Sequence, residues 1–271
     1  MMAAASDYCV VITRPQAQAK QWAGLLAAEG FHTSALNVLA IVPVSSEEKI
    51  RAIKNKILDF DLYQKAIFVS QNAVDFGMQW LEDYWPQLPM GIDFFAVGAT
   101  TAKKLSEYGV SVSDLAVSGN GGMTSEDLLC APGLQQVDGE KIIIFRGCGG
   151  RGHMADVLRQ RGAWVEYCEL YERELPADAA IELAELVQQI NLAERQYLLS
   201  VHSGESLENL LQVLQKLAPE VNAMLLNLPL LVPSQRIATQ AEAAGFARVI
   251  CADNATDAAM TQALKSYLAS H

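Results

Sequence analysis

The strongest constraint on the fold of this 271-residue chain is an internal repeat. Residues 8–44 and residues 141–176 share one pattern: an apolar strand, a turn with an arginine, a helix, a glycine, a second strand and a proline. The glycines are Gly30 and Gly162, and each stands where the helix would end. Glycine is the usual C-terminal cap of a helix, because it adopts the left-handed backbone conformation without strain. Both copies therefore predict a strand–helix–strand unit.

A second set of similar segments interleaves with the first. Each consists of an apolar strand, a turn of small residues and a helix, and the matched pairs are 66–81 with 197–214 and 93–110 with 229–246. Shorter segments follow in which Thr124 and Thr256 are placed to cap the N-terminus of a final helix. Because the matching pieces occur in the same order, we interpret them as a duplication.

Strand alternates with helix in every one of these segments. Such alternation predicts an α/β fold, with parallel sheets covered by helices on both faces. Two domain arrangements fit: the two halves of the chain fold in succession, or the two ends fold together and the middle folds by itself. Pro43 and Pro176 suit crossings between domains, because the residue before a proline favours extended backbone. The residues alone leave both arrangements open.

Composition and charge narrow the class of protein. Apolar residues make up 51% and charged residues 19% of the chain, as in packed globular proteins. No basic and apolar leader is present, and no apolar stretch is long enough to span a bilayer, so we expect a cytoplasmic protein. The net charge of −11 argues against nucleic acid and anionic membranes as partners.

The cysteines and histidines indicate no disulfide framework and no metal. Five cysteines without a C-x-x-C spacing suit free thiols in a reducing compartment, and the four histidines show no metal-ligand spacing. Cys148 could act as a nucleophile, but we favour a small residue tolerated in a turn, since no histidine stands at a meaningful distance along the chain.

Candidate binding residues follow the expected strands. In open parallel sheets, ligands bind where strands end and helices begin, because helix N-termini present free N–H groups to anions. Taken singly, each turn here is better explained as an ordinary helix cap, but the set suggests one ligand with several anionic arms. The substrate-binding candidates are Thr13, Arg14, Ser70, Asn72, Gly98, Thr101, Arg146, Gly149, Gly150, Arg151, Ser203, Gly204, Ser234 and Arg236.

The glycine-rich loop allows two interpretations. Gly147, Gly149 and Gly152 match G-x-G-x-x-G, and Glu166 follows at the spacing of a ribose ligand, as in NAD(P)-dependent oxidoreductases. However, the matching turn of the first copy, TRPQAQAK, has no glycine, and the strand with Glu166 looks like a sheet edge. Arginines flank the loop, and arginine is the usual bidentate partner of a carboxylate. We therefore favour a carboxylate cradle, with dinucleotide binding as the alternative.

Tyr171 is the candidate catalytic residue. It stands in ELYERELP, just before the second proline crossing. A tyrosine hydroxyl is protonated at neutral pH and could donate a proton to a ligand. The alternative is a tyrosine packed at a domain junction. No Ser-His-Asp order or close carboxylate pair offers a competing centre.

Taken together, these motifs resemble the bacterial members of the uroporphyrinogen-III synthase family. The resemblance covers nearly the whole chain, and its order and spacing are more specific than any single motif. The motifs are T-R-P (13–15), F-x-S-x-N-A-V (68–74), V-G-x-x-T-A (97–102), R-G-x-G-G-R (146–151), L-Y-E-R (170–173), S-G-E-S-L (203–207), P-S-x-R-I-A (233–238) and A-T-D-A (255–258).

The resemblance implies a specific fold. It implies two flavodoxin-like parallel-sheet domains joined by a two-strand hinge, with the active site in the cleft between them. Residues 1–40 and 175–271 would form one domain, and residues 41–174 the other. The sequence shows no long apolar seam that would suggest an obligate dimer, so we expect a monomer. With a two-strand hinge, we expect the cleft to open and close.

The resemblance also implies a reaction. The family cyclises hydroxymethylbilane, a linear tetrapyrrole with eight carboxylates, to uroporphyrinogen III, with inversion of ring D and loss of water. No cofactor is used, and transient contact with hydroxymethylbilane synthase is implied. The course runs through an azafulvene and a spiro intermediate. A non-catalytic two-domain anion-binding protein is a further alternative.

Individual residues match the family pattern to different degrees. Tyr171 matches the family tyrosine that assists loss of the hydroxyl group, and Thr101 matches a cleft threonine. Ser234 and Arg236 lie in a turn that departs from the vertebrate pattern of the family. His202 stands where threonine is common in bacterial members, which leaves its role open.

Overall fold

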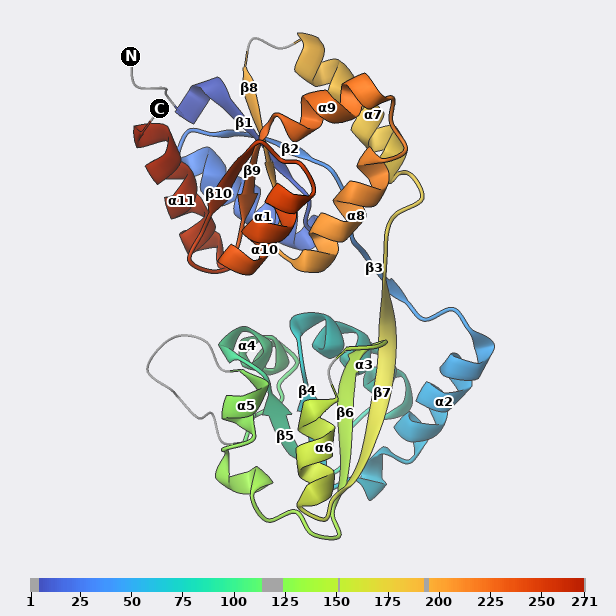
Figure 1. The fold of residues 1–271 in the computed structure, drawn as a ribbon. Helices are drawn as coiled ribbons and strands as arrows, with labels where there is room; N and C mark the ends of the chain where they lie inside the picture. The colour runs from blue at the N-terminus through green and yellow to red at the C-terminus, as the bar shows by residue number, and fades with distance from the viewer. Residues whose placement is uncertain (1–4, 114–123, 151, 193–194, 271) are drawn as a thin grey trace. The chain divides into compact units, whose positions relative to one another are not determined.

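The computed structural model describes residues 5–113, 124–150, 152–192 and 195–270. The chain forms two compact units. The terminal unit consists of Met1–Ala40 and Glu174–His271, and the central unit of Ile41–Arg173. In Figure 1 the terminal unit is coloured dark blue to blue up to residue 40 and golden yellow to red from residue 174, and the central unit runs from lighter blue through green to yellow.

The terminal unit contains a five-stranded sheet in the order β10-β9-β8-β1-β2, and all its strand pairs are parallel. Counted along this unit, the order is 2-1-3-4-5, which is that of flavodoxin-like folds. The two ends of the chain meet in the pairing of β1 with β8. The strands are β1 (Tyr8–Ile12), β2 (His32–Ala35), β8 (Gln196–Ser200), β9 (Pro229–Val232) and β10 (Arg248–Cys251).

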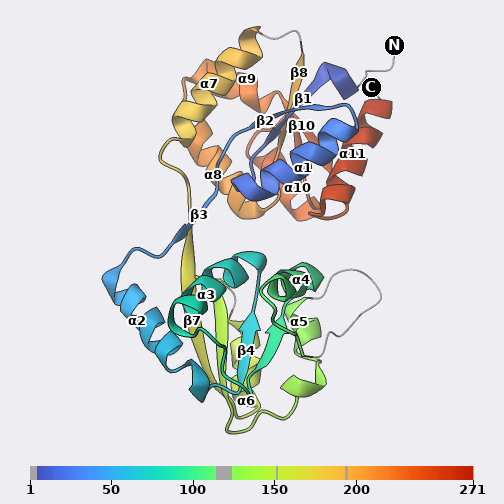
Figure 2. The same cartoon turned by 180° about the vertical axis from the view of Figure 1, so that it is seen from behind.

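Helices cover both faces of this sheet because its strands are apolar on both sides. Val10 packs with α1 and α11, whereas the next residue, Val11, packs with α7, α8 and α10 on the opposite face (Figures 1 and 2). This alternation is the period-two geometry of a strand buried on both faces. The helices are α1 (Gln16–Ala28), α7 (Ala179–Leu192), α8 (Gly204–Leu214), α9 (Pro219–Leu226), α10 (Gln235–Ala243) and α11 (Asp257–Ala269), with a short 3₁₀ helix, η1, at Ala5–Asp7.

The central unit contains a second five-stranded sheet, in the order β3-β7-β6-β4-β5. Its pairs β4–β5, β4–β6 and β6–β7 are parallel. If β4 is counted first, the order is again 2-1-3-4-5, with β3 in the fifth place although it comes first along the chain. The strands are β3 (Ala40–Pro43), β4 (Lys65–Phe68), β5 (Asp93–Ala96), β6 (Lys141–Gly147) and β7 (Trp164–Glu174).

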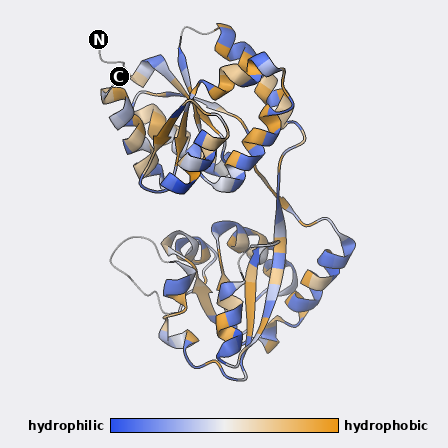
Figure 3. Cartoon of the chain, viewed as in Figure 1, coloured by the Kyte–Doolittle hydropathy of each residue, from blue (hydrophilic) through white to orange (hydrophobic). Residues whose placement is uncertain are grey.

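Helices also cover both faces of the central sheet. One face packs against α2, α3 and α4, and the other against α5, η3 and α6. Figure 3 shows hydrophobic residues along the strands and alternating polarity along the helices. The helices are α2 (Glu47–Leu58), α3 (Gln71–Tyr84), α4 (Ala99–Glu107), α5 (Ser125–Leu128) and α6 (His153–Gln160), with 3₁₀ helices η2 (Phe60–Leu62) and η3 (Pro132–Leu134).

The predicted α/β fold with parallel sheets is confirmed, but two details of the prediction are wrong. The single strand expected before Pro43 is two strands, β2 and β3, which belong to different sheets. The strand with Glu166 is not a sheet edge, because β7 lies between β3 and β6. The chain passes from one unit to the other at Ala40–Ile41 and at Arg173–Glu174. Both passages lie on these neighbouring strands.

The predicted helix ends are confirmed. Gly30 and Gly162 follow α1 and α6 with φ of +89° and +90°. Thr124 and Thr256 cap α5 and α11 by accepting hydrogen bonds from Asp127 N and Ala259 N. Residues 120–123 of the segment with Thr124 lie outside the described residues.

Gly162 is the glycine cap with the least room. A Cβ atom there would lie 3.1 Å from Cα of Asp138 and would clash with its carboxylate. We expect Gly162→Ala to lower the free energy of unfolding by about 2–3 kcal/mol, through strain at positive φ and this clash. Gly109→Ala is the matched control, because Gly109 also follows a helix with positive φ but has no atom within 4 Å; we expect a loss of about 1 kcal/mol. Urea unfolding of both variants measures the difference, and equal losses would contradict a role for Asp138.

Candidate active site

The strand order marks one favoured ligand position in each unit. In a 2-1-3-4-5 sheet the chain moves outwards in opposite directions from the first strand, so the turns after the first and third strands diverge and leave a crevice. This position lies between β1 and β8 in the terminal unit and between β4 and β6 in the central unit. Most of the predicted binding residues lie in the turns beside these two positions.

A cavity of about 320 Å³ occupies this position in the central unit. Its walls come from the turn after β4, the glycine-rich loop after β6, the start of α6, the short α5 and the end of β7. The lining residues are Val69, Ser70, Val97, Ser125, Glu126, Ile144, Arg146, Gly147, Gly149, Gly150, His153, Met154, Tyr167, Tyr171 and Arg173. The structure therefore brings together five predicted residues: Ser70, Arg146, Gly149, Gly150 and Tyr171.

Ser70 and Tyr171 form a hydrogen-bonded pair of hydroxyl groups in this cavity. Their oxygens lie 2.9 Å apart, although the residues come from the turn after β4 and from β7. Ser70 is also the N-cap of α3, where its Oγ accepts a hydrogen bond from Ala73 N at 3.1 Å. The helix N-terminus thus fixes the serine oxygen, and the serine in turn contacts the tyrosine hydroxyl.

The ring of Tyr171 is almost completely buried, with 1% of its surface exposed. It stacks on Phe76, with ring centroids 5.4 Å apart. A change of register pairs Tyr171, rather than Leu170, with Gly147, so β7 carries one extra residue there. Such bulges redirect a side chain at a sheet end. A Cβ atom at Gly147 would lie 2.5 Å from Cε2 of Tyr171, so the ring requires glycine at this place.

Arg146 organises the glycine-rich loop. Its guanidinium group donates to the carbonyl oxygens of Gly147 and Gly149 and lies over the ring of Tyr167, 4.6 Å from the centroid. The residue is only 9% exposed. Because these contacts engage the guanidinium with its own loop, Arg146 shapes the loop and adds a fixed positive charge beneath it.

The loop backbone is built to face an anion. Gly149 and Gly150 have φ of +73° and +91°, a conformation that disfavours any side chain. The N–H of Gly149 donates to the carboxylate of Glu169 at 3.2 Å. The loop therefore holds one carboxylate of the chain itself, and the binding of a ligand carboxylate there stays a prediction.

The dinucleotide interpretation conflicts with the strand register. Glu166 pairs with Ile143 inside the sheet, whereas the glycine loop begins only at Gly147, after the strand end. It lies beside Tyr63, and burial together with the Glu166 carboxylate raises the pKa of that phenol. A ribose held by the loop would have no access to this carboxylate. Moreover, β6 is not the first strand of its sheet, where the fingerprint belongs.

Comparison with known proteins identifies the family. The family model described as Uroporphyrinogen-III synthase HemD matches residues 20–262. The chain belongs to the uroporphyrinogen-III synthase family. It is 35% identical over 201 residues to Uroporphyrinogen-III synthase of Escherichia coli (strain K12), covering 73% of this chain and 76% of the relative. It is 29% identical over 170 residues to the enzyme of that name from Proteus mirabilis, covering 60% and 79%.

Solved structures of the family share the fold. Uroporphyrinogen-III synthetase from Helicobacter pylori 26695 matches with a TM-score of 0.58 at 15% identity, over 96% of this chain and 98% of that chain. A mutant uroporphyrinogen III synthase from Thermus thermophilus matches with a TM-score of 0.55 at 18% identity, over 97% and 100%. At these identities the likeness concerns the fold alone.

Other predicted residues of the central unit lie around the same sheet end. Asn72 is half-buried in the first turn of α3, and Thr101 is 2% exposed in the first turn of α4. Gly98 precedes α4 with φ of +86°. None of these three lines the cavity. Arg151 lies outside the described residues.

Cys148 is not an activated nucleophile. Burial raises the pKa of its thiol, although the Lys49 ammonium nearby acts in the opposite direction. Lys49 Nζ donates to its Sγ at 3.5 Å and also forms an ion pair with Glu172. A thiol with a raised pKa has little thiolate at neutral pH, which supports the interpretation of Cys148 as a small turn residue.

Several predicted residues of the terminal unit form hydrogen bonds or ion pairs within that unit. Thr13 is fully buried, and its hydroxyl donates to Ser200 O at 2.7 Å. Arg14 forms an ion pair with Asp257. Ser203 caps α8 through Ser206 N at 3.0 Å.

The β8–α8 and β9–α10 turns meet at the exposed Arg236. A Cβ atom added at Gly204 would lie 3.7 Å from Arg236 Nη1, which shows how closely these residues approach. Arg236 Nη1 also donates to Gln240 at 3.4 Å. Ser234 is the N-cap residue of α10 but makes no side-chain cap bond. Arg236 is therefore the predicted residue of this unit best placed to meet an incoming anion.

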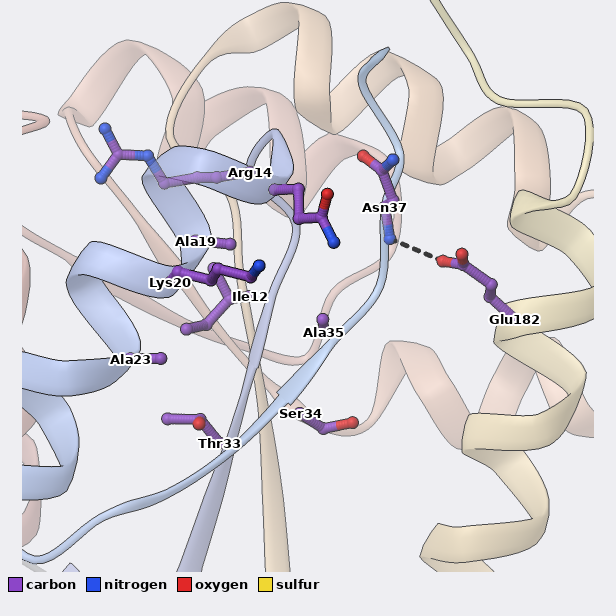
Figure 4. Close-up of a pocket in the computed structure, with 11 residues that line it drawn as sticks. Ile12, Arg14, Ala19, Lys20, Ala23, Thr33, Ser34, Ala35, Asn37 and Glu182 are labelled. Atoms are coloured by element: carbon purple, nitrogen blue, oxygen red, sulfur yellow. Dashed lines mark hydrogen bonds between the residues drawn. The ribbon is translucent and has the colours of Figure 1, made fainter.

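A second cavity, of about 510 Å³, lies beside α1 and the edge strand β2 in the terminal unit (Figure 4). Lys20 of α1 and Asn37 line it, and Asn37 N donates to Glu182 of α7 at 2.9 Å. Arg14 also lines it, but Figure 4 shows its guanidinium directed away from the other labelled residues. This cavity lies beside β1 and β2 rather than between β1 and β8, so its size does not make it the better candidate.

Sequence reasoning missed five polar residues of the central cavity: Ser125, Glu126, His153, Tyr167 and Arg173. Arg173 stands two residues after Tyr171 along β7, so strand periodicity offered a signal for it. For Tyr167 the extra residue between Glu169 and Tyr171 breaks this periodicity. The other three come from helix N-termini, where no such spacing exists. In the described part of the chain, no group of three or more His, Cys, Asp or Glu could hold a metal ion. No helix of these residues is long and apolar enough to cross a membrane.

His202, whose role the sequence left open, follows β8 and packs edge-to-face against Trp22, with ring centroids 4.7 Å apart. Both ring nitrogens are buried and have no hydrogen-bond partner among the described residues. Burial, with a smaller effect of the Arg14 guanidinium, lowers the pKa of His202 to about 3. The imidazole is therefore neutral in the folded protein at all ordinary pH values.

The neutral His202 makes the terminal unit sensitive to acid. The pKa of His202 in the folded protein lies below the unfolded value of 6.5. The fold therefore has its full stability with respect to this group above pH 6.5, and this contribution is lost as the pH falls towards 3. Between pH 7 and pH 4.5 we expect the wild type to lose about 2–3 kcal/mol more stability than His202→Gln, which cannot titrate there. Hydrogen-exchange protection of the β8 amides at both pH values measures this. An identical loss in both proteins would show that His202 titrates normally in the fold.

Proposed function

We propose that this chain cyclises hydroxymethylbilane to uroporphyrinogen III, with inversion of ring D and loss of water. Family membership supports this reaction. The single structural observation that carries it is the Ser70–Tyr171 hydroxyl pair in a cavity bounded by the glycine-rich loop. The pair supplies a proton donor, and the loop supplies a place for a carboxylate.

Each step of the proposed reaction makes a defined demand on the protein. Tyr171 donates a proton to the departing hydroxyl group on ring A, and water leaves to give an azafulvene. Ring D then attacks through its substituted carbon, and the resulting spiro intermediate fragments and recloses with the ring reversed. Direct closure without inversion competes. The protein therefore works mainly by holding one conformation of a flexible chain, which is catalysis by positioning.

The glycine-rich loop supplies part of this positioning. Its Gly149 N–H already points to a carboxylate, that of Glu169, and Arg146 lies beneath the loop with a permanent positive charge. A propionate or acetate arm of the substrate would replace Glu169 at this position. In the terminal unit, Arg236 and the N-terminus of α8 at Ser203 offer similar chemistry to other arms.

The two alternatives are less well supported. An NAD(P)-dependent oxidoreductase would need the glycines for pyrophosphate, whereas Gly147 makes room for Tyr171 and Gly150 for Arg146. A non-catalytic anion-binding protein would explain the loop, but it gives no reason for a buried tyrosine hydroxyl aligned with a serine.

The function is tested by the isomer that forms. Freshly generated hydroxymethylbilane is mixed with the purified protein without added cofactor, the products are oxidised, and the uroporphyrin isomers are separated by chromatography. We expect the type III isomer to dominate. A reaction with heat-denatured protein gives the background of unassisted closure, which yields type I. If the native protein also gives only type I, the proposal is wrong.

Arg146→Ala tests the role of the loop. Without the guanidinium the loop loses its internal hydrogen bonds, so we expect KM to rise about tenfold while kcat changes by less than about threefold. Arg159→Ala is the control, because Arg159 also lies near Tyr167, at 5.6 Å from the ring, but does not line the cavity. A fall in kcat at unchanged KM would instead place Arg146 in the chemical step.

A further inference from the structure

Three groups in the central unit form a continuous hydrogen-bonded chain that ends at the proposed acid. The N–H of Ala73 donates to Ser70 Oγ at 3.1 Å, and Ser70 Oγ lies 2.9 Å from Tyr171 Oη. The first group belongs to the N-terminus of α3, where the helix dipole is positive. The chain therefore connects a helix end to the tyrosine hydroxyl through one serine.

The number of hydroxyl hydrogens and lone pairs limits which hydrogen bonds Ser70 and Tyr171 can form. A serine hydroxyl has one hydrogen and two lone pairs, and Ala73 N–H occupies one lone pair of Ser70. The Ser70–Tyr171 contact uses one hydroxyl hydrogen, so the other hydroxyl hydrogen of the pair remains available. When Ser70 is the donor in this contact, the phenol hydrogen is the one that remains available for the substrate. After the phenol has lost its proton, only Ser70 has a hydrogen left to donate.

We propose that Ser70 is a positioning residue that stabilises the tyrosinate formed when Tyr171 protonates the leaving hydroxyl group. This proposal rests on the function proposed above. In the step, the Tyr171 proton passes to the hydroxyl oxygen of the substrate, the C–O bond breaks with its electron pair on that oxygen, and water leaves. The substrate keeps the positive charge as the protonated azafulvene, and Tyr171 keeps the negative charge. The proton released at ring closure restores the phenol.

The surroundings of the pair favour this charge. A hydrogen bond from a hydroxyl to an anionic oxygen is about twice as strong as one between neutral groups. Ser70 Oγ stays fixed by Ala73 N–H while its own hydrogen turns to Tyr171, so the three groups polarise one another in the same sense. The guanidinium of Arg173 lies 6.0 Å from the centroid of the Tyr171 ring and adds a positive charge nearby. Burial of the ring keeps water from screening these effects.

The corresponding serine of the terminal unit shows that capping alone does not produce this arrangement. Ser203 caps α8 through Ser206 N at 3.0 Å, much as Ser70 caps α3. Its Oγ then lies 2.9 Å from the hydroxyl of Ser206, within the same helix turn. Only the central unit directs a cap serine to a tyrosine from another strand, among the caps that the structure describes.

A double-mutant cycle tests the proposal. Wild type, Ser70→Gly, Tyr171→Phe and the double variant are compared in the rate of type III formation at saturating hydroxymethylbilane. Glycine is nearly as good an N-cap as serine, so Ser70→Gly removes the hydroxyl with little effect on α3. We expect Ser70→Gly to lower kcat about 10- to 100-fold with KM within about threefold. In the Tyr171→Phe background it should change kcat by less than about twofold, because no tyrosinate then forms.

Two further variants separate chemistry from stability. Ser70→Thr keeps both the cap and the hydroxyl and should retain kcat within about threefold. Thr256→Ala removes the side-chain cap of α11 and should lower the melting temperature without lowering kcat. If Ser70→Gly does not fold, Ser70→Asp replaces it, since aspartate caps the helix but has no hydrogen to donate.

Three outcomes of these measurements would contradict the proposal. Equal losses of kcat from Ser70→Gly in both backgrounds, a change in KM alone, or an unchanged kcat in Tyr171→Phe would overturn it. These results are distinct from failure of the proposed function, in which the wild type itself would form only the type I isomer.

Discussion

The structure depends on the parallel pairing of β1 with β8, which joins the first strand of the chain to one that begins at Gln196. Side chains reinforce this pairing on both strands: Thr13 donates to Ser200 O, and Ser200 donates to Val11 O at 2.8 Å. All three residues are fully buried, so these bonds form away from water. Because the two chain ends share a sheet, the central unit, Ile41–Arg173, is an insertion between β2 and α7.

The inserted central unit has the same strand order as the terminal unit, but its strands follow one another differently along the chain. The terminal sheet uses its own first strand as the centre of the 2-1-3-4-5 order, whereas the central sheet begins with β3, which takes the outermost place beside β7. This arrangement leaves β4 and β6 as the central pair, and their diverging turns hold Ser70 and the glycine-rich loop. It also places Tyr171 near the end of β7, three positions before Glu174, where the chain enters the terminal unit. The proposed acid and the passage between units therefore lie on one strand.

The sequence predicted the elements well because their signals are local. Apolar runs, glycines after helices and hydroxyl caps before them depend on neighbouring residues, and Gly30, Gly162, Thr124 and Thr256 all lie where these rules put them. The pairing of strands could not be derived in the same way, since both domain arrangements bury the same apolar residues. Likewise, the bulge that sets Tyr171 beside Gly147 depends on register between two strands and leaves no mark in either one alone.

The glycine-rich loop shows that a sequence motif can be interpreted only when its position in the sheet is known. Its spacing fits a dinucleotide turn, yet the structure gives separate reasons for its glycines: Gly147 leaves space for a tyrosine ring, and Gly149 and Gly150 adopt positive φ around the Arg146 side chain. The Gly149 N–H of this loop donates to the Glu169 carboxylate beside the fixed positive charge of Arg146, an arrangement that suits a small anion. What distinguishes a carboxylate arm from a pyrophosphate is the next wall of the cavity. That wall carries the hydroxyl group of Tyr171, the proposed proton donor, which suits a substrate that loses a hydroxyl group.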